Sequence, residues 1–298
     1  MAAEGDDIIR YTYRGEEGEI IPREATHIVV LARVIPSEAF RWHGNIVEVI
    51  CHEDVEKIET AALANCYSLR RVVMPGVKIV KMWAFSNCPA LTDVECEKLE
   101  MIGEEAFSVC ESMRSIDLPS AEIVVERAFA DCKALTDVKF GSRLERIEEK
   151  VFLGCTSLER ITFPMKDGII DENDIFQGCC NLKYADLVEG KLQETIAALH
   201  LHIWRNDMNR EIDSINRILP ITYAGYEWDE DAMEYGDPGQ KAWAIRAWIR
   251  SVLRKIIHYQ AEHRRVLNEA ATTLQLVLPQ DIAMNNVLPF LELPAHWS

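Results

Sequence analysis

The chain has 298 residues, of which 48% are hydrophobic and 27% charged, so it is large enough for one elongated globular domain and an appended one. An excess of 49 acidic over 32 basic residues gives a net charge of −17, which excludes nucleic-acid binding over the surface at large, because phosphate contacts need concentrated Lys and Arg. No apolar run reaches 18 residues and the acidic start MAAEGDDIIR lacks an apolar segment, so the sequence predicts neither a membrane span nor a secretory signal.

Residues 1–34 are expected to form an N-terminal β cap. Tyr11–Tyr13 and His27–Leu31 have the composition of strands, and Gly15–Gly18 has the composition of a turn. We therefore predict a β-hairpin at this end. It would shield the first core layer of the segment that follows, as an open stack of repeats requires.

Residues 35–188 contain seven repeats of 22–24 residues, recognised by columns of apolar side chains. One column is aromatic in six of the seven repeats and contains Phe40, Leu63, Phe85, Phe107, Phe129, Phe152 and Phe176. Three residues after each of these stands a member of a second column, His43, Cys66, Cys88, Cys110, Cys132, Cys155 and Cys179. Three further columns of Leu, Val and Ile follow the same period, so the segment is predicted to be a solenoid with one continuous core.

Each repeat contains a strand template and a short apolar turn. Leu91-x-x-Val94-x-Cys96 fills the L-x-x-L-x-L strand pattern of leucine-rich repeats, with Val94 and Cys96 pointing into the core. The A-F-x-x-C segment is too short for a full helix, and we expect it to form one or two helical turns on the opposite wall. The predicted fold class is therefore an α/β solenoid, a leucine-rich repeat stack with a C-terminal all-α segment.

The full pattern I-x-x-x-A-F-x-x-C-x-x-L-x-x-V-x-L-P is clearest in Ile102–Pro119 and Ile147–Pro164. It resembles the BspA-type class of leucine-rich repeats. The opening YTYRGEEGEIIPREATHI and the closing WIRSVLRKIIHYQAEHRRVLNEAATTLQL further resemble leucine-rich repeat proteins from diatoms. The resemblance implies a fold but no catalytic residues. The sequence departs from the pattern at Leu63, His43 and Ala185, so irregular end repeats are expected.

Nine cysteines are present, an odd number, and eight of them occupy inward positions of the repeats. Free Cys behaves as a small buried hydrophobe. We therefore expect reduced thiols and a cytoplasmic protein. Repeat-length spacings provide no paired ligands for zinc, and no nucleophile or phosphate-loop motif is present, so no metal, cofactor or catalytic residue is predicted.

Outward strand positions form the surface that such solenoids use for binding. The candidate partner-binding residues on this surface are Arg71, Asp93, Glu95, Asp117, Asp137, Lys139, Arg160 and Tyr184. The central carboxylates favour docking of another protein with a basic surface. The alternative is a solvated face whose charges serve solubility and oppose edge pairing.

Helical periodicity replaces the repeats after residue 188. Residues 189–222 are predicted to be a helical hairpin or C-terminal cap, with Asn206 and Asp207 capping its second helix. Residues 223–237 indicate an acidic linker. Residues 238–298 are predicted to form one helix of about 40 residues, starting at Asp237-Pro238, and then short helices.

The apolar stripe of the long helix has two possible partners. The two shorter helices could cover it within the molecule, or residues 238–278 could pair with a second chain as a coiled coil. Its polar side is expected to contain the basic residues Lys241, Arg246, Arg250, Arg254, Lys255, Arg264 and Arg265. These residues could bind an external anion or neutralise acidic segments of the same chain.

The sequence thus favours a non-catalytic protein-interaction scaffold that binds its partner on the strand face. The alternative is an oligomeric structural component that assembles through the long C-terminal helix. An enzyme built on scattered residues is the third class considered. It would require a deep polar pocket.

Overall fold

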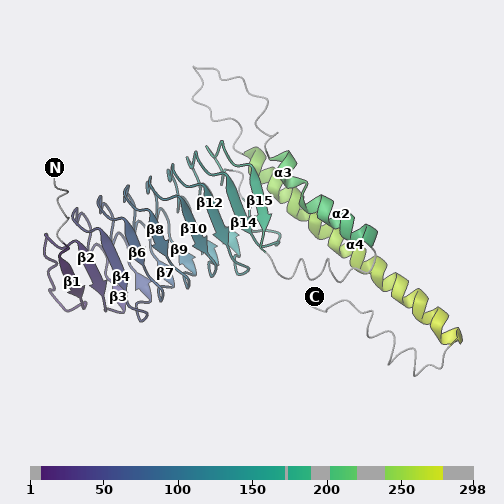
Figure 1. The fold of residues 1–298 in the computed structure, drawn as a ribbon, viewed down its shortest axis with the longest axis horizontal. Helices are drawn as coiled ribbons and strands as arrows, with labels where there is room; N and C mark the ends of the chain where they lie inside the picture. Colours follow the sequence, from purple (N-terminus) through teal and green to yellow (C-terminus); the bar gives the residue numbers. More distant parts are fainter. Residues whose placement is uncertain (1–7, 172–173, 189–201, 220–238, 278–298) are drawn as a thin grey trace, which may run out of the picture. The chain divides into compact units, whose positions relative to one another are not determined.

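A computed structural model of the chain describes residues 8–171, 174–188, 202–219 and 239–277. The chain divides into two compact units. The first comprises Met1–Val188 and Ile218–Ile245, and the second comprises Glu189–Arg217 and Arg246–Ser298. The first unit is a solenoid of stacked coils, which follow one another in chain order from β1 to β15 (Figure 1).

One wall of the solenoid is made of the longer strands, which pair in parallel with the strands of neighbouring coils. A first sheet contains β1 (Arg10–Tyr13), β2 (His27–Val30), β4 (Glu48–Cys51), β6 (Arg71–Val73) and β8 (Asp93–Glu95). A second sheet contains β10 (Ser115–Leu118), β12 (Asp137–Phe140), β14 (Arg160–Phe163) and β15 (Tyr184–Leu187). The alternation of inward and outward side chains predicted from the repeats is present in both sheets.

The predicted N-terminal hairpin is wrong. Strands β1 and β2 are parallel, with Tyr11 opposite Ile28, so both strands continue the first sheet in register with β4. Apolar alternation identifies a strand but not its direction. The connection between β1 and β2 is long enough to return the chain to the start of the next parallel strand. Glu19 holds this connection, because its carboxylate accepts hydrogen bonds from the backbone N–H groups of Arg14 and Gly15.

A further wall is made of two-residue strands in one continuous parallel sheet. These are β3 (Val34–Ile35), β5 (Lys57–Ile58), β7 (Ile79–Val80), β9 (Met101–Ile102), β11 (Ile123–Val124) and β13 (Arg146–Ile147). Each contributes one buried aliphatic side chain of the column predicted five residues before the aromatic position.

The A-F-x-x-C segments form no helical turns. They are consecutive tight turns that stack on one another, and we refer to them as the turn wall. The N–H of Phe85 donates to the carbonyl of Ala106 in the next coil at 2.8 Å, and the N–H of Phe107 donates in the same way to Ala128. Because the neighbouring coil satisfies these N–H groups, the backbone does not need the i to i−4 hydrogen bonds of a helix.

The core is continuous through the coils. The rings of the aromatic column stack face to face, with centroids 5.0 Å apart between Phe85 and Phe107 and 5.8 Å apart between Phe152 and Phe176. Tyr13 packs edge-on against Phe40 at the N-terminal end of the column. The predicted apolar columns are thus confirmed as one spine of buried side chains.

The start of the long helix α4 (Gly239–Val277) belongs to the first unit. Lys241 was expected on the polar side of this helix, but its side chain is buried and donates a hydrogen bond to the carbonyl of Leu182 in the last coil. Burial lowers the pKa of Lys241 to about 8.

The second unit pairs α2 (His202–Ile212) and α3 (Ile215–Ile218) with the rest of α4 (Figure 1). Asn206 and Asp207 do not cap a helix; both lie inside α2. Tertiary contacts override their capping tendency, since Asp207 accepts hydrogen bonds from Lys255 at 2.8 Å and from Tyr259 at 2.6 Å. These donors lower the pKa of the Asp207 carboxyl group. Within the second unit, α2 lies against the apolar stripe of α4 as far as His263, which is buried beside Trp204.

Several predicted features lie outside the described residues, including the first helix of the hairpin, the acidic linker, the Asp237-Pro238 helix start and the segment after α4. Within the described ranges, none of the helices combines the length and the apolar character that a bilayer crossing needs.

Candidate functional site: the strand face

The outward side chains of the eight longer strands from β2 to β15 form two files, which together we name the strand face. The first file contains His27, Glu48, Arg71, Asp93, Ser115, Asp137, Arg160 and Tyr184. The second contains Val29, Ile50, Val73, Glu95, Asp117, Lys139, Thr162 and Asp186. Both files match the register predicted from the repeats. The parallel coils fix this register because each inward side chain must meet the same core column.

Opposite charges in adjacent coils pair along most of this face. Arg71 hydrogen-bonds Glu48 at 3.0 Å and Glu95 at 2.7 Å. Farther along, Arg160 pairs with Asp186 and also lies 4.5 Å from the ring centroid of Tyr184. Such exposed pairs contribute only about 0–1 kcal/mol each. They do, however, neutralise much of the charge that a partner would meet.

One neighbouring pair in the files carries like charges. In the second file, Glu95 is followed by Asp117. Arg71 of the preceding coil pairs with Glu95, and Lys139 of the following coil lies 3.8 Å from Asp117. Because Arg71 reaches Glu95 from the first file, the charges in these four successive coils have the order plus, minus, minus, plus. Like charges on adjacent strands are destabilising. No other position in the two files brings like charges together.

The ladder of backbone hydrogen bonds is interrupted at the same place. The N–H of Asp93 donates to Arg70 at 3.1 Å and the N–H of Asp137 donates to Arg114 at 3.3 Å, yet Ser115 makes no equivalent bond to Thr92. The two sheets of this wall therefore end at β8 and begin again at β10, which we name the ladder gap. The small-strand sheet continues without a break from β9 to β11.

The ladder gap opens the wall locally. Val94, which was predicted to point fully into the core, is only half-buried, whereas the other members of its column are buried. The equivalent hydrogen bond at the far end of the strand, from the N–H of Cys96, is also missing. Its thiol lies 3.7 Å from the carbonyl oxygen of Asp117 instead. Backbone groups on both strands are thereby left for another partner.

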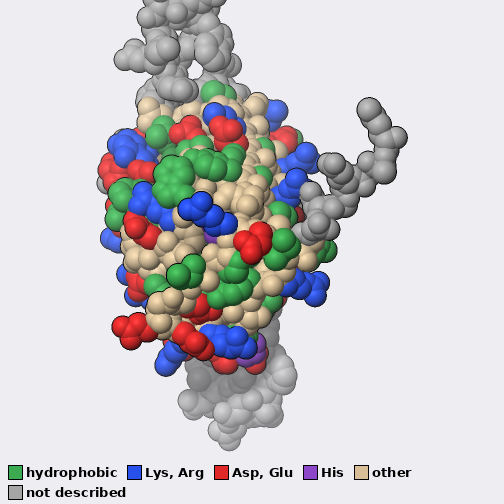
Figure 2. All heavy atoms as spheres, turned by 90° about the vertical axis from the view of Figure 1, so that its left-hand side faces the viewer, with side chains coloured by type: hydrophobic (Ala, Val, Ile, Leu, Met, Phe, Trp, Pro, Cys, Tyr) green, Lys and Arg blue, Asp and Glu red, His purple; other side chains and the backbone are tan. Residues whose placement is uncertain are grey.

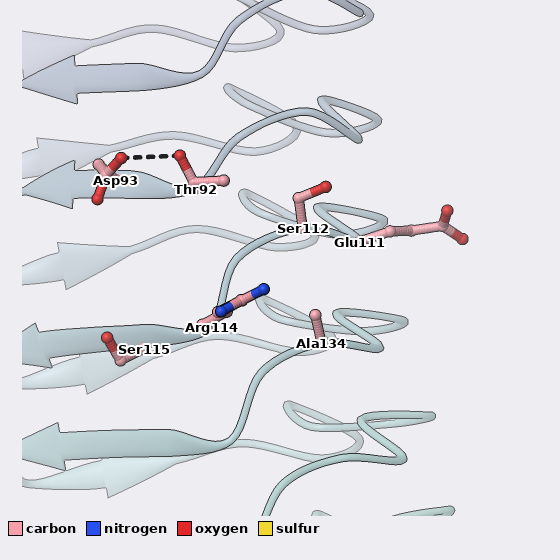
Figure 3. A pocket seen from close by; sticks show the side chains of 7 residues that line it. All are labelled: Thr92, Asp93, Glu111, Ser112, Arg114, Ser115 and Ala134. Atoms are coloured by element: carbon pink, nitrogen blue, oxygen red, sulfur yellow. Dashed lines mark hydrogen bonds between the residues drawn. The ribbon is translucent and has the colours of Figure 1, made fainter.

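A cleft of about 610 Å³ lies over one end of the ladder gap. It is lined by Thr92, Asp93, Glu111, Ser112, Arg114, Ser115 and Ala134 (Figure 3). Figure 3 shows Asp93 and Ser115 on neighbouring strands, with Thr92 and Arg114 just before them and the remaining lining residues on the turns beside them. The hydroxyl of Thr92 donates to the Asp93 carboxylate at 2.7 Å, which orients that carboxylate.

The charged groups around the cleft differ in what they contact. Glu111 is paired with Lys133 at 2.7 Å. Arg114 is exposed and has no ion pair in the described part of the chain. Asp137, next to Ser115 in the first file, keeps its Oδ1 atom shielded from water without a hydrogen-bond donor. A buried acceptor without a donor is costly, so a donor from a bound molecule would be stabilised there.

The thiols offer no comparable chemistry. Eight cysteines are buried, and the column members donate to the carbonyl of the aromatic position in the preceding coil, as Cys110 does to Phe85 at 3.3 Å. Burial raises the pKa of the Cys66 and Cys132 thiols to about 12, so neither forms the thiolate that nucleophilic attack requires. Cys180 alone is exposed. In the described residues, no group of His, Cys, Asp and Glu side chains is arranged to hold a metal ion.

A model of the BspA type leucine rich repeat region matches the chain in six copies, over residues 33–125 and 100–197. The chain belongs to this family. The match extends over more than half of the sequence and includes every coil from β3 onward. Stacked repeats of this kind generally provide extended surfaces for protein–protein interaction, and they typically serve as scaffolds rather than as enzymes.

Solved structures similar to this BspA-type chain are also leucine-rich repeat proteins. One from Bacteroides ovatus is 22% identical over 61% of this chain and 43% of its own, with a TM-score of 0.43. One from T. pallidum is 19% identical over 59% of this chain and 73% of its own, with a TM-score of 0.40. This chain thus spans less than half of the Bacteroides ovatus protein. A search of curated proteins found no match.

All eight candidate residues predicted from the sequence lie on the strand face of the BspA-type coils, but they do not form one cluster. Arg71, Asp93 and Glu95 lie on one side of the ladder gap, and the other five lie on the far side. Sequence analysis missed the gap itself and the residues Thr92 and Arg114 beside it. The sequence signal that could have indicated the ladder gap was the acidic pair Glu95 and Asp117, which are one repeat apart.

Proposed function

We propose that this BspA-type chain is a non-catalytic scaffold that binds another protein on its strand face, with a Lys or Arg side chain of the partner entering the ladder gap between Glu95 and Asp117. The single observation that carries this proposal is the coincidence of the interrupted ladder with the like-charged pair. A cation placed there turns the row of charges into a strict alternation. It would also relieve the repulsion between the two carboxylates.

Two further features support the same occupant. Backbone groups of β8 and β10 lack their ladder partners at the gap, so a main-chain segment of the partner has donors and acceptors to bond. The unpaired Oδ1 of Asp137 accepts one more donor. Complementary charge of this kind acts mainly on association rate and on the choice of partner, so binding should weaken as ionic strength rises.

The experiment is affinity capture from the native extract with quantitative mass spectrometry. The triple variant Asp93→Lys, Glu95→Lys, Asp117→Lys is expected to lose the proteins that the wild-type chain retains. A matched control reverses three exposed acids away from the strand face, Glu53→Lys, Glu97→Lys and Glu145→Lys, with the same change in net charge. Retention of the same proteins by both variants would show that binding does not use the ladder gap.

We propose a cytoplasmic, reducing setting for this interaction. The thiol column supports it, because its sulfurs donate to carbonyl groups and none is joined in a disulfide. Trapping the chain with an alkylating reagent during lysis measures its thiol state in the cell. Nine free thiols are expected. Recovery of disulfide-linked chain would place the protein in an oxidising compartment.

A second candidate function is self-association through the far part of α4. Val266 continues the apolar stripe beyond His263, and its side chain is 41% exposed. Light scattering of the full chain over a range of concentrations tests this function. A dimer that Val266→Glu converts to a monomer would support it. A wild-type monomer at all concentrations would remove it.

A further inference from the structure

We infer that the turn wall contains a second binding site, built around Trp42 and Tyr67, for a proline-rich segment in the polyproline II conformation. The site lies outside the strand face and does not depend on the proposed function. We name it the aromatic corner, which comprises Trp42, Asn65, Tyr67 and Asn87. Its residues come from three successive coils near the N-terminal end of the solenoid.

The aromatic corner begins with an open pair of rings. Trp42 is 60% exposed and Tyr67 is 44% exposed. Their ring centroids are 6.0 Å apart, and the ring planes are inclined by 57°. Figure 2 shows hydrophobic side chains reaching the surface among charged ones at this end of the solenoid. These two exposed rings offer apolar faces on which flat, apolar rings of a ligand can pack.

The backbone at Trp42 adopts the conformation that recurs at this position of the turn wall, although it suits tryptophan poorly. Its φ is +64°, in the left-handed region that bulky side chains avoid. Asn65 and Asn87 occupy the same position in the next two coils with φ of +63° and +57°, and Asn tolerates this conformation well. An exposed tryptophan therefore stands at a position where the next two coils have asparagine.

The polar groups of the aromatic corner are mainly donors. No acceptor among the described residues contacts the indole N–H of Trp42, which is a donor only. The Oδ1 atom of Asn65 accepts from Asn87 Nδ2 at 2.7 Å, so the amide nitrogen of Asn65 remains available to a ligand. The Tyr67 hydroxyl lies between the two amides, 3.4 Å from Asn65 and 3.5 Å from Asn87.

A polyproline II segment has the complementary chemistry. Proline has no backbone N–H, so such a segment presents carbonyl acceptors and flat apolar rings, and its fixed φ lowers the entropic cost of binding. It repeats every three residues, or about 9.3 Å at about 3.1 Å per residue. Two coils of the solenoid span about 9.6 Å at about 4.8 Å per coil. A ligand along the stack would thus present equivalent prolines to alternate coils.

A neutral oligosaccharide is the other ligand that stacks on exposed aromatic rings. Each of its hydroxyl groups is a donor as well as an acceptor, so it needs acceptors from the protein. The Asn65 oxygen already accepts from Asn87, so among the described residues the amides of the corner leave one free oxygen acceptor, that of Asn87, against the N–H groups of Asn65 and the indole N–H of Trp42. The donor excess at the aromatic corner therefore favours the proline-rich segment, and the sugar becomes an outcome of the test.

The experiment titrates the full chain with acetylated, amidated decaproline and follows tryptophan fluorescence and heat of binding. A Gly-Ser decapeptide and cellohexaose are titrated in parallel. The wild-type chain is expected to bind decaproline only, and Trp42→Asn is expected to weaken this binding by at least about 30-fold, as loss of an aromatic anchor does. Trp42→Asn should be no less stable than wild type in thermal unfolding, since asparagine suits the position.

The matched control is Trp83→Asn. Trp83 is also exposed, and its φ is +59°, but it belongs to the other left-handed position of the turn wall. This variant should bind decaproline as wild type does. Binding of cellohexaose instead of decaproline, binding of neither, or equal loss in the two variants would each overturn the inference.

Discussion

Left-handed backbone conformations recur at two positions in the turn of each of the first six repeats. Most of these positions are occupied by residues other than glycine, and their φ angles lie between +49° and +64°. A side chain with a Cβ atom makes this conformation unfavourable by roughly 1–2 kcal/mol. The stacked turns tolerate this cost because each turn is hydrogen-bonded to the next coil. Substitutions at these positions therefore reveal how much strain the turn wall stores.

Val109 is the most strained of these residues, because a β-branched side chain is least suited to φ of +59°. Val109→Asn is expected to stabilise the protein by about 1 kcal/mol, since it relieves this strain and extends the amide contact between Asn65 and Asn87 to the next coil. Urea unfolding measures the change. Val109→Ala keeps the strain of a Cβ atom and should gain less. A less stable Val109→Asn variant would contradict the assignment of strain.

Gly141 is required for a close approach between coils. A Cβ atom there would lie 1.9 Å from the carbonyl oxygen of Pro119, a backbone atom that cannot rotate away. Gly141→Ala should therefore destabilise the protein by about 3 kcal/mol or more. At Gly44 a Cβ atom would meet nothing within 4 Å, so Gly44→Ala should be neutral or gain up to about 1 kcal/mol. Equal effects in thermal unfolding would refute the stacking described here.

At the scale of the element, the thiol column couples neighbouring coils by burial and by S–H to carbonyl hydrogen bonds. Burial raises the pKa of the Cys66 thiol from its usual 9.0 to about 12. The neutral thiol is thus the form that the folded state favours. Its contribution is complete below the unfolded pKa of about 9 and is lost as pH rises toward 12.

The free energy of unfolding should consequently fall steeply above pH 9. Each buried thiol contributes a slope of about 1.4 kcal/mol per pH unit, because the unfolded chain loses that proton first. Cys66→Ala should be less stable than wild type at pH 7 but should have a shallower slope between pH 9 and about 12. Denaturant unfolding at a series of pH values tests this prediction. Parallel slopes in the two proteins would mean that Cys66 titrates normally.

The ladder gap is an element-scale feature that coincides with one pair of like-charged side chains, and we predict that their repulsion causes it. Asp117→Thr removes the repulsion with Glu95 and introduces a residue that favours strands. The free energy of unfolding should increase by about 0.5–1 kcal/mol. The matched control is Asp186→Thr in the same file, which removes an attraction to Arg160 and should leave stability unchanged or lower. If both variants change stability alike, repulsion is not the cause of the gap.

At the scale of the whole molecule, the repeat spacing was enough to predict the solenoid, its core and its outward register. Each column residue must be buried against its equivalent in the next coil, so a period of 22–24 residues fixes which side chains stack. Phe107, Cys110 and Met113 illustrate this outcome, since all three are fully buried as their columns predicted. The eight candidate residues were placed on the strand face for the same reason.

The other features of the fold and of the strand face depended on interactions that the spacing of the repeats does not encode. The direction of β1 follows from a loop organised by Glu19, which the alternation of side chains does not report. The turn wall uses left-handed backbone conformations at residues such as Trp83 and Arg127, whose types favour no such conformation. Asp207 has the composition of a cap but is held inside α2 by Lys255. The ladder gap likewise lies between two coils that each match the repeat pattern, so neither coil alone indicates it.

The central claim is that the strand face is interrupted between β8 and β10, where a partner can enter. Amide hydrogen exchange at single-residue resolution tests it most directly, because backbone N–H groups without a hydrogen bond exchange rapidly. The amides of Ser115 and Cys96 should exchange much faster than those of Asp93 and Asp137, which have ladder partners in the equivalent positions. Equal protection of all four amides would show a continuous ladder and would contradict the account.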